Sequence, residues 1–100
     1  MATSKIESTL VLKKDFTKSG IEIASNGFAV AELSAADIAV SGYKPIGIMG
    51  VTNSGSGRTF ILIYEFGLLS SGGLRVGLRN FDNSTRTIAI TVTVLYIREQ

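Results

Sequence analysis

The sequence contains no cysteine, no histidine and no tryptophan, and it has one proline among its 100 residues. Without cysteine the chain forms neither a disulfide nor a thiolate nucleophile, and without histidine it lacks the commonest general base. The same absences remove the usual ligands of zinc and iron–sulfur centres. We therefore predict a protein that is not an enzyme, has no catalytic or metal-binding residues and uses no cofactor.

A strong excess of charge of one sign is also missing, because ten Lys and Arg residues against eight Asp and Glu residues give a net charge of +2. Binding to a phosphate backbone needs a much denser basic surface, so we expect no nucleic-acid partner. No apolar run approaches the roughly 20 residues that cross a bilayer, and the first residues lack the pattern of a signal peptide. We expect no membrane insertion and no classical secretion.

Hydrophobic residues make up 45% of the chain, and they are spread along its whole length. A chain of this size suffices for one core and leaves no room for a second. Residues 1–100 are therefore predicted to form a single domain.

Alternation of apolar with other residues is the dominant pattern, and it is clearest near the C-terminus. Val92 and Val94 fall on the apolar face of that segment, and Thr91 and Thr93 fall on the opposite face. We predict a long strand there, with its valines buried. Similar but shorter patterns predict strands at residues 5–13, 20–24, 45–52, 58–66 and 74–80.

Turn-forming stretches of Gly, Ser, Asn and Asp separate these strands. Parallel sheets would need helical crossovers of a dozen residues, which the chain does not contain, so the strands should be antiparallel. The predicted fold is an all-β, antiparallel β-sandwich of jelly-roll-like form. Residues 28–40 are an exception, for which we predict a strand and then one helical turn near residues 34–40, because Ser34 and Asp37 have the spacing of a capping box.

The segment at residues 58–66 is apolar on both faces. Phe60, Leu62 and Tyr64 share one face with Phe66, whereas Ile61 and Ile63 make the opposite face apolar too. One core covers only one of these faces, so a loop or another subunit must cover the second. We predict a homo-oligomer, most simply a trimer, whose interface includes Ile61 and Ile63.

Candidate ligand-binding residues are Arg75, Arg79 and Tyr43. The two arginines lie on one face of their predicted strand, about 13 Å apart at strand rise, where they could bind an anionic sugar or a phosphate. The alternative is a solvated strand face or cross-strand pairs with acids. Tyr43, Phe28 and Phe81 lie near turns, where an aromatic ring could stack on a sugar or simply extend the core.

Four parts of the C-terminal half resemble the small β-sandwich head domains of phage and prophage tail proteins. These are residues 42–48 (GYKPIGI), 64–66 (YEF), 79–80 (RN) and 90–98 (ITVTVLYIR). Such head domains run from a similar Gly-Tyr-x-Pro opening to a long alternating strand that ends in Leu-Tyr. The resemblance implies a trimeric jelly roll in tail fibres or receptor-binding proteins, with a host-surface saccharide or protein as its partner.

The preferred hypothesis is therefore a non-enzymatic structural and adhesion module of a phage-type tail, located in the virion tail. The main alternative is a monomeric carbohydrate-binding module, which would expose two or three aromatic side chains on a flat sheet face. A third hypothesis, a small enzyme that uses paired carboxylates, would require two of the eight scattered acids to meet in a cleft.

Overall fold

The computed structural model describes residues 10–99, and strands dominate this part of the chain. Two short helical turns interrupt the strands: α1, with four residues, and the 3-10 turn η2, with three. The elements in chain order are β1 (Val11–Ile23), β2 (Phe28–Leu33), α1 (Ala35–Ile38), β3 (Tyr43–Ser54), η2 (Arg58–Phe60), β4 (Ile61–Leu68), β5 (Leu74–Asn80) and β6 (Arg86–Arg98).

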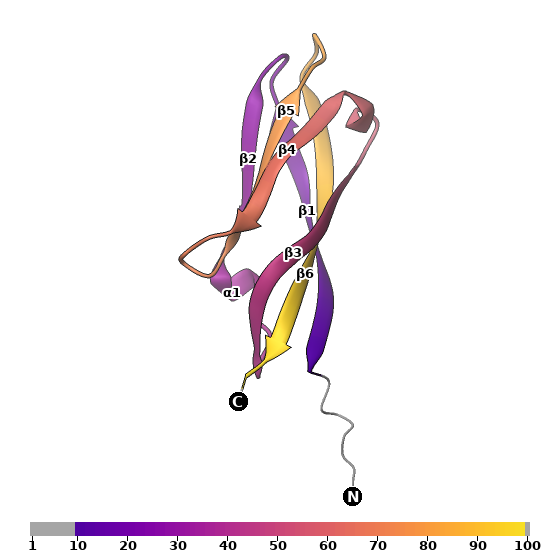
Figure 1. The fold of residues 1–100 in the computed structure, drawn as a ribbon. Helices are drawn as coiled ribbons and strands as arrows, with labels where there is room; N and C mark the ends of the chain where they lie inside the picture. Colours follow the sequence, from indigo (N-terminus) through magenta and orange to yellow (C-terminus); the bar gives the residue numbers. More distant parts are fainter. Residues whose placement is uncertain (1–9, 100) are drawn as a thin grey trace, which may run out of the picture.

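These strands form two antiparallel sheets of three strands each, in the orders β1-β6-β3 and β2-β5-β4. Figure 1 shows the long strands of the first sheet running beside the shorter strands of the second. The predicted all-β, antiparallel fold is confirmed. The pairing is nested, since β1 pairs with β6 and β2 pairs with β5, which is compatible with a rolled-up hairpin. A jelly roll has eight strands and six are described here, so the sandwich and jelly-roll assignments stay predictions.

The core is a single cluster that takes residues from both sheets, and strict alternation along β6 supplies its largest part. Val92 and Val94 are fully buried, whereas Thr91 and Thr93 on the other face are partly exposed. The predicted faces of the last strand are therefore confirmed. The other sheet contributes Leu74, Val76 and Leu78 to the same cluster.

Strand β1 corrects the prediction for the N-terminal region, where separate strands were expected at residues 5–13 and 20–24. The structure has one strand from Val11 to Ile23, which pairs with β6 along its length and has a register shift between Lys18 and Ile21. Gly20 has a φ of +68° there, a conformation that glycine adopts without strain. The register shift therefore does not end the strand, and β1 continues to pair with β6 on both sides of it. The expected residues 5–9 lie outside the described residues.

The helical turn α1 follows β2 as predicted. The Ser34 hydroxyl accepts a hydrogen bond from the Asp37 backbone N–H at 3.1 Å, and the Asp37 carboxylate accepts one from the Ser34 N–H at 3.0 Å. This reciprocal capping box begins the helix. Ile38 is fully buried, and its carbonyl accepts a hydrogen bond from the Tyr96 hydroxyl, so α1 covers the inner face near the end of β6.

The segment at residues 58–66 shows the largest difference from the prediction. Its first three residues form η2 rather than strand, and β4 begins at Ile61. Ile61 pairs with Asn80 and Ile63 with Leu78, so both isoleucines face the core instead of an intersubunit surface. Leu62 and Tyr64 point outward and are 49% and 44% exposed. The predicted interface residues are therefore wrong, and the uncovered apolar face is the opposite one.

Asn80 is the one fully buried polar residue among those described. Its side-chain nitrogen lies 3.0 Å from the carbonyl oxygen of Ile23, 3.2 Å from that of Ala24 and 2.9 Å from that of Ser84, and its oxygen accepts from the Asp82 N–H at 2.8 Å. A single amide therefore joins the end of β1 to the connection between β5 and β6.

Candidate functional site

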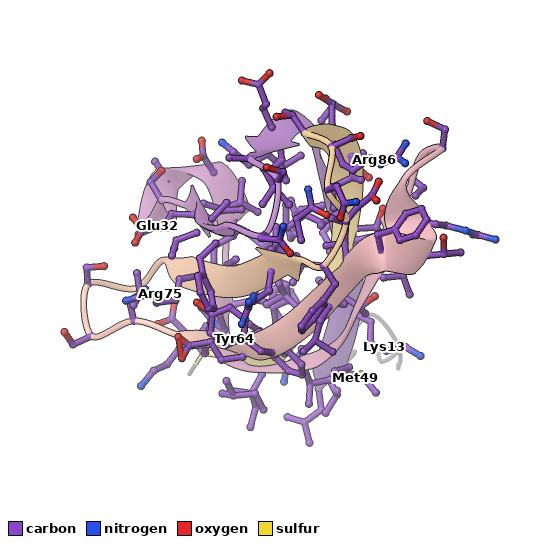
Figure 2. The ribbon with its side chains drawn as sticks, turned by 90° about the horizontal axis from the view of Figure 1, so that it is seen from above. Lys13, Glu32, Met49, Tyr64, Arg75 and Arg86 are labelled. Carbon is purple, nitrogen blue, oxygen red and sulfur yellow. The ribbon has the colours of Figure 1, made fainter. Side chains whose placement is uncertain are left out.

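The outer face of the sheet β2-β5-β4 carries an unusual set of side chains for a solvated surface. Paired residues in neighbouring antiparallel strands point to the same side of a sheet. The register places Phe28 and Leu62 on either side of Arg79, and Glu32 and Gly67 on either side of Arg75. Figure 2 shows Glu32 and Arg75 on one side of the molecule, away from Lys13 and Met49.

Arg79 lies at the centre of an aromatic cluster. Its Cζ atom is 4.7 Å from the ring centroid of Phe28 and also 4.7 Å from that of Phe81. Phe28 in turn meets Tyr64 edge to face, with a centroid distance of 5.7 Å and an interplanar angle of 89°. Each cation–π contact contributes about 0.5 to 2 kcal/mol. The guanidinium therefore lies between two rings, and Tyr64 extends the cluster through its contact with Phe28.

Tyr64 lies two residues after Leu62 on the outer face of β4, next to an irregularity of this strand. The register shifts between Ile63 and Glu65, so Tyr64 is the extra residue of a bulge. Its ring lies over Gly77 of β5, where an added Cβ would come within 2.7 Å of the Tyr64 Cζ. Glycine at position 77 therefore lets the ring lie flat against the strand between Arg75 and Arg79.

The three rings are well exposed, at 62% for Phe28, 44% for Tyr64 and 55% for Phe81. Beside Phe81 there is a shallow hollow of about 270 Å³ lined by Thr59, Phe60, Ile61, Leu62 and Phe81. The rings, this hollow and the two arginines make up what we call the aromatic–arginine face. Its members are Phe28, Leu62, Tyr64, Arg75, Arg79 and Phe81.

Neither arginine of this face has a charged partner in the described part of the chain. The Nε atoms of Arg75 and Arg79 are shielded from solvent and have no hydrogen-bond partner there. Arg86 differs, because its guanidinium lies 4.9 Å from the Phe60 ring centroid and also pairs with the Asp82 carboxylate, with the Arg86 Nε 2.7 Å from the Asp82 Oδ2. The chain thus neutralises one aromatic-bound arginine and leaves Arg79 without a counter-charge.

The structure brings together two of the three predicted ligand residues. Arg75 and Arg79 share the outer face of β5, as the alternation predicted. Tyr43 instead begins β3 in the other sheet, opposite Arg98, and packs partly against the core. Tyr64 was not predicted as a site residue, because its segment is apolar on both faces and the sequence alone does not show which of the two faces is buried.

A larger hollow of about 560 Å³ lies beside α1, and its lining includes two acids, Glu32 and Asp37. Asp37 is committed to the capping box, and the hydrogen bonds from the Ser34 backbone and side chain lower the pKa of its carboxyl. A general acid needs a raised pKa instead. Asp37 is therefore suited to capping rather than to proton donation.

Comparison with known proteins gave no matching family model, no similar curated protein and no similar solved structure. Within residues 10–99 no helix is long and apolar enough to cross a membrane. In the same range no cluster of three or more acidic, His or Cys side chains could hold a metal ion.

Proposed function

We propose that this chain is a non-catalytic adhesion module that binds a saccharide through the aromatic–arginine face. The observation that carries the proposal is a cluster of three exposed rings on one side of a sheet, two of them against the Arg79 guanidinium and the third, Tyr64, against Phe28. A large exposed apolar patch on a small domain commonly marks a binding surface. The setting in a phage-type tail rests on the sequence resemblance alone.

The chemistry of this face suits a sugar because sugar rings have apolar C–H faces and polar edges. Phe28 and Phe81 offer apolar surface for the C–H groups, and Tyr64 adds a hydroxyl to its ring. The guanidinium of Arg79 offers hydrogen-bond donors in a fixed plane for the polar edge. The face therefore provides stacking and hydrogen bonding side by side.

Isothermal titration calorimetry with a panel of neutral and acidic oligosaccharides tests this function. We expect binding by the wild type and a loss of binding in Phe28→Ala. Met49→Ala is the matched control, because Met49 is equally an exposed apolar side chain, 56% accessible, but belongs to the other sheet. If no saccharide binds, or if both variants lose affinity equally, the proposed function is wrong.

Self-association is the second candidate function, and a separate apolar patch favours it. Val11 and Ile97 are cross-strand neighbours on the outer side of β1 and β6, and Ile46 and Met49 lie at the two irregularities of β3. All four are between 37% and 56% exposed. A homo-oligomer, such as the predicted trimer, would bury this patch and leave the aromatic–arginine face free for a ligand.

Light scattering coupled to size exclusion at micromolar concentration tests the assembly. We expect an oligomeric wild type and a monomeric Ile46→Glu/Met49→Glu variant. The control is Leu62→Glu, which changes an exposed apolar residue of the other sheet and should leave the mass unchanged. A monomeric wild type would contradict the proposed assembly and leave the monomeric binding module.

A further inference from the structure

We infer that the saccharide bound by this face is acidic, and that Arg79 holds its carboxylate. This inference rests on the proposed function and narrows it to one class of ligand. It begins from an imbalance in the structure: Arg79 is a permanent cation that lies against the rings of Phe28 and Phe81 and has the apolar Leu62 as its partner in β4. An arginine in apolar surroundings is costly unless an anion or a set of acceptors compensates it.

The comparison with Arg86 shows that this chain can supply such an anion itself. Arg86 packs against Phe60 and takes its counter-charge from Asp82, four residues earlier in the chain. Arg79 has two rings instead of one and no ion pair in the described part of the chain. Both arginines therefore lie against aromatic rings, but Arg86 is paired with a carboxylate of this chain, whereas Arg79 remains able to bind a carboxylate of a ligand.

The acidic residues on this side of the sheet are not cross-strand partners of Arg79. Glu32 is the cross-strand partner of Arg75, and Glu65 is the cross-strand partner of Gly77. Arg75 thus has an acidic residue at its cross-strand position, although the two form no ion pair, whereas the positions directly opposite Arg79 are Phe28 and Leu62. Arg79 is consequently the stronger anion site of the two, and Arg75 is the natural control.

A carboxylate fits Arg79 better than a neutral hydroxyl. Its two oxygens match the planar fork of the guanidinium and accept two parallel hydrogen bonds. The Phe28 and Phe81 rings that hold the guanidinium leave the attached sugar ring apolar surface on which to stack, and the hollow beside Phe81 and Leu62 can seat the neighbouring sugar unit. A sugar acid therefore satisfies the cation and the rings together.

The test compares short oligogalacturonates with their methyl esters, which keep the sugar rings and lose the charge. We expect calorimetry to show wild-type protein binding the acid at least about tenfold more tightly than the ester, because a hydrogen bond to a charged group is worth about 1.5 to 3 kcal/mol. Arg79→Lys should remove most of this preference and leave binding of the ester. Arg75→Lys should have a smaller effect, and the preference should weaken as salt is raised.

The outcomes separate the inference from the proposed function. If the ester binds as tightly as the acid, the inference is wrong and the adhesion function stands. If neither binds, the inference is wrong, and the oligosaccharide panel decides the adhesion function separately. Preference for an aspartate-rich peptide over either sugar, or a preference that survives Arg79→Lys, would also overturn the inference. The acid–ester comparison on wild-type protein needs no variant to fold, and thermal unfolding confirms that Arg79→Lys is intact.

Discussion

The outer faces of the two sheets handle their polar groups in opposite ways. On β1-β6-β3, Thr17 Oγ1 lies 3.0 Å from Thr91 Oγ1, and Thr93 Oγ1 donates to Asp15 Oδ1 at 2.6 Å. These polar groups are satisfied across the strands. On β2-β5-β4, exposed rings surround Arg79, whose charge is unpaired within the described residues. The hydroxyl and carboxylate groups of the first face are therefore paired with one another, whereas the guanidinium of the second face is not paired with an acid of residues 10–99.

The face that carries the exposed rings and the unpaired guanidinium is the better candidate for binding. A cross-strand ladder of threonines and an aspartate is the ordinary way to solvate a sheet, and it stabilises the strands that carry it. Exposed apolar rings gain nothing from water, and leaving each large apolar side chain there forgoes roughly 1.5 to 3 kcal/mol of burial energy. The second pattern is therefore explained by a ligand, whereas the first needs no ligand.

We expect the greatest loss of stability when a charge is placed on the buried face of the sheet β1-β6-β3. Val92→Asp puts an unpaired carboxylate at a fully buried position, so we expect a loss of more than about 4 kcal/mol and an unfolded chain. Thr93→Asp changes the outer face, where it loses the bond to Asp15 and meets a like charge, at a cost of about 1 kcal/mol. Urea unfolding followed by circular dichroism measures both. Equal losses would mean that the two faces of β6 are assigned wrongly.

Asn80 gives the next largest effect, because its amide anchors the strand that carries both arginines. Asn80→Leu removes the partner of three carbonyl groups in a buried site, and we expect a loss of about 3 kcal/mol. Asn53→Leu is the control. Its amide reaches the carbonyls of Arg58 and Ile61 at 3.3 Å in a more exposed place, so the loss should be about 1 kcal/mol. A larger loss at Asn53 would contradict the role given to Asn80.

Alternation was enough to predict the strands whose two faces differ. The bounds of β5 and the faces of β6 follow directly from it, as does the common face of Arg75 and Arg79. It failed for β4, where both faces are apolar and only the register with β5 decides which one is buried. Tertiary packing decides that Ile61 is buried and Leu62 is exposed, and the alternation of residues along one strand does not predict this outcome.

The aromatic–arginine face shows the same limit. Phe28 and Phe81 were recognised as aromatic residues near turns, but their meeting at Arg79 depends on the pairing of β2 with β5. Tyr64 shares the face of Leu62 by alternation, but only the pairing of β4 with β5 shows that this face is the exposed one. A strand can be predicted from its own segment of sequence. A site formed by three strands can be predicted only if the register between the strands is known.

Tyr96 provides a prediction of intermediate size through pH. It is buried and donates its hydroxyl proton to the Ile38 carbonyl, and burial raises the pKa of its phenol above the usual 10.0. A raised pKa means that this contribution to stability is complete below about pH 10 and is lost as the pH rises through the folded-state value. Tyr96→Phe should cost about 1 to 2 kcal/mol at neutral pH.

The measurement is the urea midpoint of both proteins from neutral to alkaline pH. The wild type should lose its advantage over Tyr96→Phe above pH 10, because the phenylalanine cannot ionise. All other titrating groups are shared by the two proteins, so they cancel in the difference. A stability difference that stays constant into strong alkali would show that the Tyr96 phenol is not protected by burial.

The smallest expected effect tests the comparison of the two outer faces directly. Thr17→Ala breaks the hydroxyl pair with Thr91, and because this pair is exposed the loss of stability should not exceed about 1 kcal/mol. Saccharide affinity should not change, since this pair lies on the sheet β1-β6-β3, away from the aromatic–arginine face. Tyr64→Ala should behave in the reverse way: it removes an exposed ring that lies on Gly77 and Phe28, so affinity should fall while stability changes little. Unfolding and calorimetry on the same two variants give all four values. If Thr17→Ala weakened saccharide binding as much as Tyr64→Ala, the proposed difference in function between the outer faces of the two sheets would be wrong.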